Sequence, residues 1–119
     1  MRYNIVLTGA SSGIGSSLGN HLSKAGYKVI GLSRRKNTQN NFETLQCDVS
    51  KYNQLKKIIS KINRVDCLIN NAGIARSGIK NEVKNFDKIM QTNLNGPYYM
   101  SQLLKQKLSK SNNPSIINI

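Results

Sequence analysis

The sequence has few cysteines, few acidic residues and no long apolar run, and each shortage excludes a class of protein. Its two cysteines, Cys47 and Cys67, lack the spacing of a metal site, and we expect both to be buried and reduced. No apolar run approaches the roughly 18 residues that a membrane-spanning helix needs. The apolar stretch Tyr3–Leu7 is too short for the core of a signal peptide. We therefore expect a cytoplasmic protein with no metal and no membrane partner.

Five acidic residues stand against 18 basic ones, which gives a formal net charge of +13. The basic residues are spread along the chain, and their longest run is Arg34-Arg35-Lys36. A nucleic-acid-binding protein usually gathers its basic residues on one face and adds aromatic or helix-turn-helix signatures. Neither signature is visible, so we expect no nucleic-acid partner. A compositional bias explains the charge, and the absence of a more acidic C-terminal half would exaggerate it.

The length of 119 residues suits one domain or part of one. Short apolar runs predict strands at Asn4–Thr8, Lys28–Leu32, Phe42–Cys47, Val65–Asn70 and Ser115–Ile119. Between them, apolar residues recur every three or four positions. This periodicity predicts helices with stripes at Ile14, Leu18, Leu22 and Ala25 and at Leu55, Ile58, Ile59 and Ile62, and further helices over Glu82–Gln91 and Leu94–Ser111. The alternation predicts an α/β fold with a doubly wound parallel sheet.

Three residues indicate where helices begin, end or bend. Gly26 suits the left-handed position just after the first helix. Ser50 is a candidate N-terminal cap for the second helix. Pro97 lies early in the last helix, so we expect a helix start or a kink near Asn93–Asn95.

The segment Thr8-Gly9-Ala10-Ser11-Ser12-Gly13-Ile14-Gly15 lies between the first strand and the first helix. Glycines at these positions let the backbone turn tightly and approach a phosphate without a Cβ in the way. A helix that begins at about Gly13 directs its free N–H groups and its positive dipole end at that phosphate. The spacing G-x-x-x-G-x-G differs from the common G-x-G-x-x-G dinucleotide motif, but its position between a strand and a helix indicates phosphate binding.

The segment Thr8–Gly15, together with Asp48, Asn70-Asn71-Ala72-Gly73 and Asn93, resembles the short-chain dehydrogenase/reductase family in order and spacing. The resemblance implies a Rossmann-type fold, with Ser115–Ile119 beside Val65–Asn70. It implies that residues 1–119 are a partial NAD(P)-binding domain, truncated after the fifth strand. It assigns one catalytic residue, Asn93, whose helix would kink to hold a proton-relay water. It assigns these positions to the cofactor: Gly9, Ser11, Gly13, Ile14, Gly15, Asp48, Val49, Asn70, Ala72 and Gly73.

The end of the second strand favours NADP(H) over NAD(H). An enzyme that prefers NAD usually has an acidic residue there, which accepts from the ribose 2′-OH and repels a 2′-phosphate. Here the position holds Ser33, and the next residue, Arg34, is a donor suited to phosphate. Ser12, one residue before Gly13, could add a hydroxyl. We therefore add Ser12, Ser33 and Arg34 to the cofactor-binding residues. The alternative is that Arg34-Arg35-Lys36 is simply a solvated loop of a basic protein.

For other candidate residues, the alternative to a role in cofactor binding or catalysis is a purely structural role. Asp48 could cap the helix that begins near Lys51. Asn70-Asn71 could be a turn that ends a strand, and Asn93 could mark a helix boundary.

The resemblance also implies a catalytic serine and a Tyr-x-x-x-Lys pair, and neither is found in the expected place. Ser115–Ile119 resembles the strand that leads into that serine, and the chain ends roughly two residues before it. Tyr52 and Lys56 have the right spacing, but they precede the asparagine motif. We therefore expect an N-terminal fragment of an NADP(H)-dependent oxidoreductase that is inactive alone.

In a full-length form, the family resemblance implies carbonyl/alcohol interconversion on a small substrate, with 3-oxoacyl thioester reduction as one candidate, and a homo-oligomer. Two alternatives stay open. One is a dinucleotide-binding module without catalysis, and the other is a basic nucleic-acid-binding protein.

Overall fold

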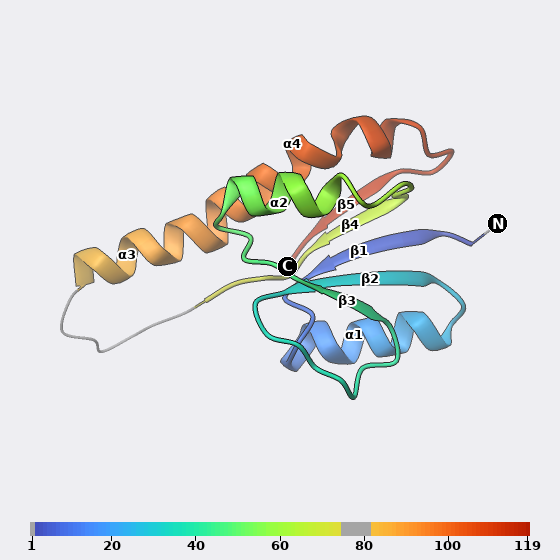
Figure 1. Cartoon of the computed structure of the whole chain (residues 1–119), viewed down its shortest axis with the longest axis horizontal. Coiled ribbons are helices and arrows are strands. Elements are labelled where there is room, and N and C mark those ends of the chain that lie inside the picture. The colour runs from blue at the N-terminus through green and yellow to red at the C-terminus, as the bar shows by residue number, and fades with distance from the viewer. Residues whose placement is uncertain (1, 75–81) are drawn as a thin grey trace.

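The computed structural model describes residues 2–74 and 82–119 (Figure 1). The described elements follow one another along the chain as β1 (Asn4–Thr8), α1 (Gly13–Lys24), β2 (Lys28–Ser33), β3 (Glu43–Gln46), α2 (Tyr52–Ile59), β4 (Cys67–Asn70), α3 (Glu82–Met90), η1 (Gln91–Asn95), α4 (Gly96–Ser109) and β5 (Ser115–Asn118). The strands form a parallel sheet in the order β3-β2-β1-β4-β5. The predicted α/β fold is confirmed, and β5 pairs with β4 as expected.

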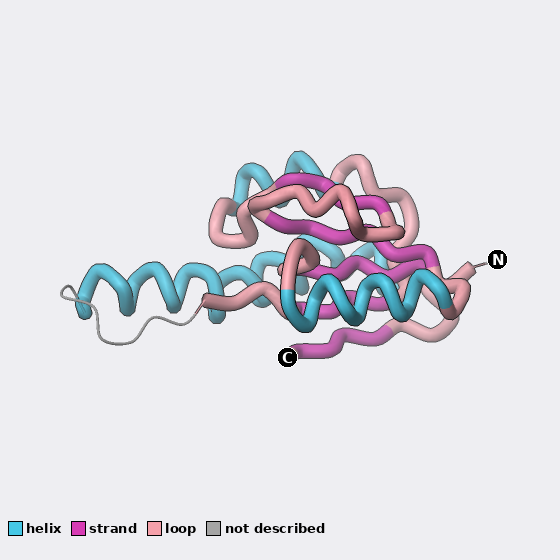
Figure 2. The backbone as a smooth tube through the Cα atoms, turned by 90° about the horizontal axis from the view of Figure 1, so that it is seen from below, coloured by secondary structure: helices cyan, strands magenta, loops and turns pink. Residues whose placement is uncertain are grey.

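Helices cover both faces of the sheet: α1 lies on one face, and α2 and α4 lie on the other (Figures 1 and 2). Alternate residues of β1 supply the two cores, because side chains of a strand point to opposite faces. Ile5 and Leu7 belong to the core beneath α1. Val6 belongs to the larger core, with residues of α2 and α4 such as Leu55 and Leu104.

Helix α1 packs through its glycines rather than through the whole predicted stripe. Gly15 and Gly19 are its buried residues, and a Cβ on Gly19 would lie 2.5 Å from the ring of Phe42. Leu18 packs against the core as predicted, but the side chain of Ile14 is 65% exposed. The prediction was therefore wrong for Ile14, because the close approach of the helix backbone turns the glycine face inward. Gly26 has a φ of +99°, as expected after the helix.

The prediction that Ser50 caps the second helix was wrong. The residue that precedes the helix is Lys51, and no side chain caps it. Ser50 instead donates from its N–H and its hydroxyl to Oδ1 of Asp48, at 2.9 and 2.7 Å. Ser50 is therefore not a helix cap. Asp48 also does not cap the helix, since its carboxylate closes a turn ahead of it.

Helices α3 and α4 are joined by η1, a π-helical turn, where a start or a kink was predicted. Pro97 has no N–H to give to the carbonyl of Asn93 four residues earlier, which explains a local departure from α-helical bonding. Helix α3 extends beyond the sheet (Figures 1 and 2). Among its apolar side chains, Val83 is 76% exposed and Phe86 is 59% exposed.

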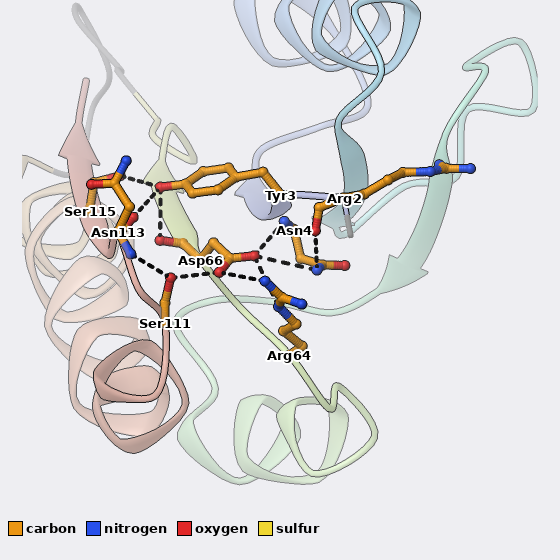
Figure 3. A network of polar contacts seen from close by, with 8 residues as sticks. All are labelled: Arg2, Tyr3, Asn4, Arg64, Asp66, Ser111, Asn113 and Ser115. Atoms are coloured by element: carbon orange, nitrogen blue, oxygen red, sulfur yellow. Dashed lines mark hydrogen bonds and ion pairs between the residues drawn. The ribbon is translucent and has the colours of Figure 1, made fainter.

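A buried carboxylate joins three segments at the amino-terminal edge of the sheet (Figure 3). Asp66 is 1% exposed, and its carboxylate accepts from the Asn4 N–H at 2.7 Å and from the Ser111 hydroxyl at 2.6 Å. The Arg64 guanidinium completes the group, with Nε 3.3 Å from Oδ2. The hydroxyl of Tyr3 donates to the Asp66 carbonyl at 3.2 Å. The network therefore fixes the starts of β1 and β4 to the segment that leads into β5.

Strand β5 lies at the edge of the described sheet, and both its faces are partly open. Ile116 and Ile117 are 46% and 47% exposed although β5 pairs fully with β4. The two cysteines are free and buried, as predicted. Among the described residues, no helix is long and apolar enough to cross a membrane, and no cluster of metal-ligating side chains is present.

Candidate functional site

A cavity of about 270 Å³ lies over the carboxyl ends of the parallel strands. The chain places β2 and β3 on one side of β1, and β4 and β5 on the other. The strand order therefore reverses between β1 and β4, which is where open α/β sheets bind ligands. The residues that line the cavity are Gly9, Ser11, Ser12, Leu32, Ser33, Arg34, Arg35, Cys47, Asp48, Val49, Asn71, Ala72, Gly73, Ile74 and Thr92.

The glycine-rich loop (Gly9–Gly15) leaves no room for side chains where it passes its neighbours. A Cβ on Gly15 would lie 2.0 Å from the carbonyl oxygen of Gly9. Gly9 and Gly13 have φ values of +67° and +54°, which favour glycine. A Cβ on Gly9 would also lie 2.8 Å from Cα of Ala72. The loop thus passes tightly between α1 and the end of β4.

The first N–H groups of α1 have no side-chain cap. Ser12 precedes the helix, makes no side-chain hydrogen bond to it and lines the cavity, and the first turn contains no acidic residue. Uncapped N–H groups and the positive end of the helix dipole together favour an anion. The donor set therefore fits a phosphate or pyrophosphate group.

The asparagine motif is held against the start of the glycine-rich loop by hydrogen bonds to Thr8 and Gly9. The hydroxyl of Thr8 accepts from the N–H groups of Asn71 and Ala72, both at 3.0 Å. The side chain of Asn71 donates to the Gly9 carbonyl at 3.2 Å. These bonds fix the segment Asn71–Gly73 as one wall of the cavity.

The end of β2 presents two arginines on a turn whose carbonyls are already bonded. The Ser33 hydroxyl donates to the carbonyl of Arg35, and Nε2 of Gln46 donates to the carbonyl of Arg34 at 2.9 Å. The carbonyl of Ser33 accepts from the Cys47 N–H at 2.8 Å. Arg34 and Arg35 are exposed and line the cavity, and position 33 holds no acidic residue.

A more apolar part of the cavity follows β3. Cys47 and Val49 are buried there, beside the partly buried Asp48. Burial, and then the charge of Asp48, raise the pKa of the Cys47 thiol to about 11. The thiol is therefore neutral at pH 7, so Cys47 can pack against a ligand but is a poor nucleophile.

Asn93 lies beside the cavity and is hydrogen-bonded to Ile74, which lines it. Its Oδ1 accepts from the Ile74 N–H, and its Nδ2 donates to the Ile74 carbonyl, both at 2.8 Å. The amide therefore positions the strand-following segment and does not face a ligand directly. Asn70 is 3% exposed, and its Nδ2 donates to Asn118 at 2.9 Å, while its Oδ1 has no hydrogen-bond partner among the described residues.

Nine of the predicted site residues line the cavity: Gly9, Ser11, Ser12, Ser33, Arg34, Asp48, Val49, Ala72 and Gly73. The other five, Gly13, Ile14, Gly15, Asn70 and Asn93, lie around it. Six lining residues were not among the predicted site residues: Leu32, Arg35, Cys47, Asn71, Ile74 and Thr92. Arg35 and Asn71 belong to motifs that the sequence displays, whereas Thr92 reaches the cavity only because η1 passes behind Gly73.

A family model described as short chain dehydrogenase matches residues 3–119. The chain belongs to the short chain dehydrogenase family. It is 33% identical to the 3-oxoacyl-(acyl-carrier-protein) reductase FabG of Rickettsia typhi, over 96% of this chain and 52% of the relative. It is 34% identical to the farnesol dehydrogenase of Aedes aegypti, over 88% of this chain and 51% of the relative.

Solved structures of other proteins share this fold. The ligand-free aldohexose dehydrogenase of Thermoplasma acidophilum matches with a TM-score of 0.93 and 32% identity, over 98% of this chain and 48% of that structure. The structure of ElxO with NADP bound matches with a TM-score of 0.84 and 28% identity, over 99% of this chain and 55% of that structure. The chain thus spans about half the length of the relatives that it matches.

Proposed function

We propose that this chain is the NADP(H)-binding part of an oxidoreductase that interconverts a carbonyl and an alcohol. The observation that carries the proposal is the cavity at the reversal of strand order, beside the uncapped N-terminus of α1. Gly9, Ser11, Gly13, Ile14 and Gly15 would line the pyrophosphate and the adenosine side of the cofactor, and the uncapped N–H groups at the start of α1 would donate to the phosphates. Membership of the family supports the assignment.

Other residues of the cavity would contact the rest of the cofactor. Asp48 and Val49, with the neutral Cys47, would surround the adenine ring. Ala72 and Gly73 would lie beneath the nicotinamide ribose, with Asn70 holding the sheet behind them. The bound nicotinamide would supply or accept a hydride.

Selectivity for a 2′-phosphate would come from the turn at the end of β2. Ser33 provides no carboxylate to repel a phosphate, and Arg34 and Arg35 both lie at the cavity. An arginine can donate two parallel hydrogen bonds to one phosphate, so its contribution is larger than that of a single neutral donor.

Calorimetric titration of the 119-residue chain should give tighter binding of NADP⁺ than of NAD⁺. Arg34→Ala should remove most of the difference, which is on the order of 1–3 kcal/mol for a charge-assisted contact. Arg2→Ala is the matched control, because it removes the same charge at the amino-terminal edge of the sheet. Equal affinities of the unaltered chain for both nucleotides would contradict the proposed preference.

The chemistry of hydride transfer to a carbonyl also needs an acid that protonates the developing alkoxide. Asn93 cannot be that acid, since an amide does not titrate in the useful range. The carbonyl of Asn93, which Pro97 cannot bond, would instead hold a water that relays the proton. After Asn93, Tyr98 and Tyr99 are followed four residues later by Gln102 and Leu103 rather than by lysine.

A polypeptide of residues 1–119 should therefore show no oxidation of NADPH above the buffer rate. The test is a spectrophotometric assay with a panel of ketones that includes 3-oxoacyl thioesters, the substrate class suggested by the FabG relatives. A relative of full length serves as the positive control. Sustained turnover by residues 1–119 would show that the acid has been assigned wrongly. Binding of NADP⁺ without turnover would also suit a dinucleotide-binding module without catalysis.

A further inference from the structure

The loop between β2 and β3 lies against the glycine-rich loop and is bonded to it by asparagine side chains. We name this segment, Arg34–Asn41, the 34–41 loop. Nδ2 of Asn37 donates to the carbonyl of Ser11, and Nδ2 of Asn40 donates to the carbonyl of Ala10, both at 3.0 Å. These carbonyls belong to the loop that we assign to the pyrophosphate.

The side chain of Asn40 makes two further hydrogen bonds, and both go to α1. Its Oδ1 accepts from the Ser16 hydroxyl at 2.6 Å and from Nδ2 of Asn20 at 3.0 Å. Oδ1 of Asn20 in turn accepts from the N–H of Asn41 at 2.8 Å. One partly buried amide, that of Asn40, therefore joins the 34–41 loop, the glycine-rich loop and the first helix.

The arginines that would contact a 2′-phosphate lie at the start of the same loop. A second cavity, of about 290 Å³, shares Ser11, Ser12 and Arg35 with the first and is otherwise lined by residues 36–39. Both loops line it, so a phosphate bound there would contact the two loops together. The position of Arg34 and Arg35 thus depends on how firmly the rest of the 34–41 loop is held.

We propose that Asn37 and Asn40 are positioning residues that hold the 34–41 loop in its phosphate-binding conformation and so set the discrimination between NADP(H) and NAD(H). The inference rests on the proposed function. Ordering a loop costs conformational entropy, and a loop that is ordered beforehand binds more tightly. NADP⁺ needs the ordered arginines, whereas NAD⁺ has no 2′-phosphate to contact them. Loosening the loop should therefore weaken the binding of NADP⁺ more than that of NAD⁺.

The test measures the dissociation constants of NADP⁺ and NAD⁺ for the 119-residue chain and for its Asn40→Ala variant. We expect the dissociation constant of NADP⁺ to rise about tenfold and that of NAD⁺ only about two- to threefold. Amide hydrogen exchange at Arg34 and Arg35 should become faster in the unliganded variant. Loss of a residue needed only for folding would weaken the binding of both nucleotides by the same factor. The decisive readout is therefore the dissociation constant of NADP⁺ divided by that of NAD⁺.

Asn41→Ala is the matched control, because Asn41 enters the network through its backbone. Its N–H donates to Asn20 and its carbonyl accepts from the hydroxyl of Ser23, and both bonds survive the substitution. The ratio should not change in this variant. If Asn40→Ala does not fold, Asn37→Ala is the deciding variant, since it removes the bond to Ser11. It should also raise the dissociation constant of NADP⁺ relative to that of NAD⁺.

An unchanged ratio in the folded asparagine variants would overturn the inference, while NADP⁺ selectivity of the unaltered chain would leave the proposed function standing. Failure of the unaltered chain to bind either dinucleotide would overturn both.

Discussion

Asp66→Ala should lower the free energy of unfolding by about 3 kcal/mol, because it removes a buried carboxylate and leaves its donors without a partner. The Asn4 N–H and the Ser111 hydroxyl both donate to this group at under 3 Å, and Arg64 pairs with it. A typical domain has only about 5–15 kcal/mol of stability, so the loss should be visible directly in urea denaturation followed by circular dichroism. The starts of β1 and β4 would lose their connection to the segment before β5.

Asp87→Ala is the matched control for this experiment. Asp87 is exposed on α3, and its removal changes the net charge by the same amount. Its effect should stay within about 0.5 kcal/mol, as for most surface substitutions. Comparable losses in both variants would mean that net charge, and not the buried network, determines the stability.

The same network predicts how stability depends on pH. Burial alone would raise the pKa of Asp66, but hydrogen bonds from Asn4, Ser111 and Arg64 outweigh it and lower the pKa from 3.8 to about 2. A carboxyl group whose pKa is lower in the folded state stabilises the fold fully above the unfolded value. This stabilisation is lost as the pH falls from about 3.8 to about 2. The difference in stability between the unaltered chain and Asp66→Ala should therefore narrow over that interval.

The sequence was sufficient for the parts of the fold that follow from local patterns. Each predicted strand exists, within two residues at either end, because parallel strands appear as short apolar runs. The motifs that line the cavity could also be found in the sequence, since Thr8 and Asn70 end β1 and β4, and Asp48 closely follows β3. Carboxyl ends of parallel strands meet at one edge, so residues that follow them come together.

The sequence did not predict features that depend on long-range contacts. Ile14 satisfies helical periodicity, but the close packing of Gly15 and Gly19 turns it outward. Asp66 is a single acidic residue in an apolar run, and nothing local indicates that Asn4 and Ser111 will surround it. The asparagines of the 34–41 loop form a polar segment in the sequence, and only the fold places Asn37 and Asn40 against the carbonyls of the glycine-rich loop.

Gly15→Ala should have the other large effect, on both stability and nucleotide binding. A Cβ at this position would lie 2.0 Å from the Gly9 carbonyl oxygen and 2.6 Å from Nδ2 of Asn71. The first contact is with backbone, so the glycine-rich loop itself must move. We expect a loss of about 3 kcal/mol in the free energy of unfolding, at the upper end for an overpacked site. Calorimetry should detect no binding of NADP⁺, because the displaced loop closes the space in front of α1.

Gly73→Ala provides the comparison, since it adds the same methyl group to the neighbouring wall of the cavity, Asn71–Gly73. Its nearest contact, with Oδ1 of Asn93, would be 3.4 Å, which is an ordinary van der Waals distance. Gly73→Ala should therefore change the unfolding free energy by less than about 1 kcal/mol. If Gly15→Ala proved as stable as Gly73→Ala and still bound NADP⁺, the close passage of the glycine-rich loop against Asn71 could not be what shapes the site. The contrast between the two variants separates the effect of an added methyl group from the effect of the backbone approach, which is the property that makes this loop a phosphate site.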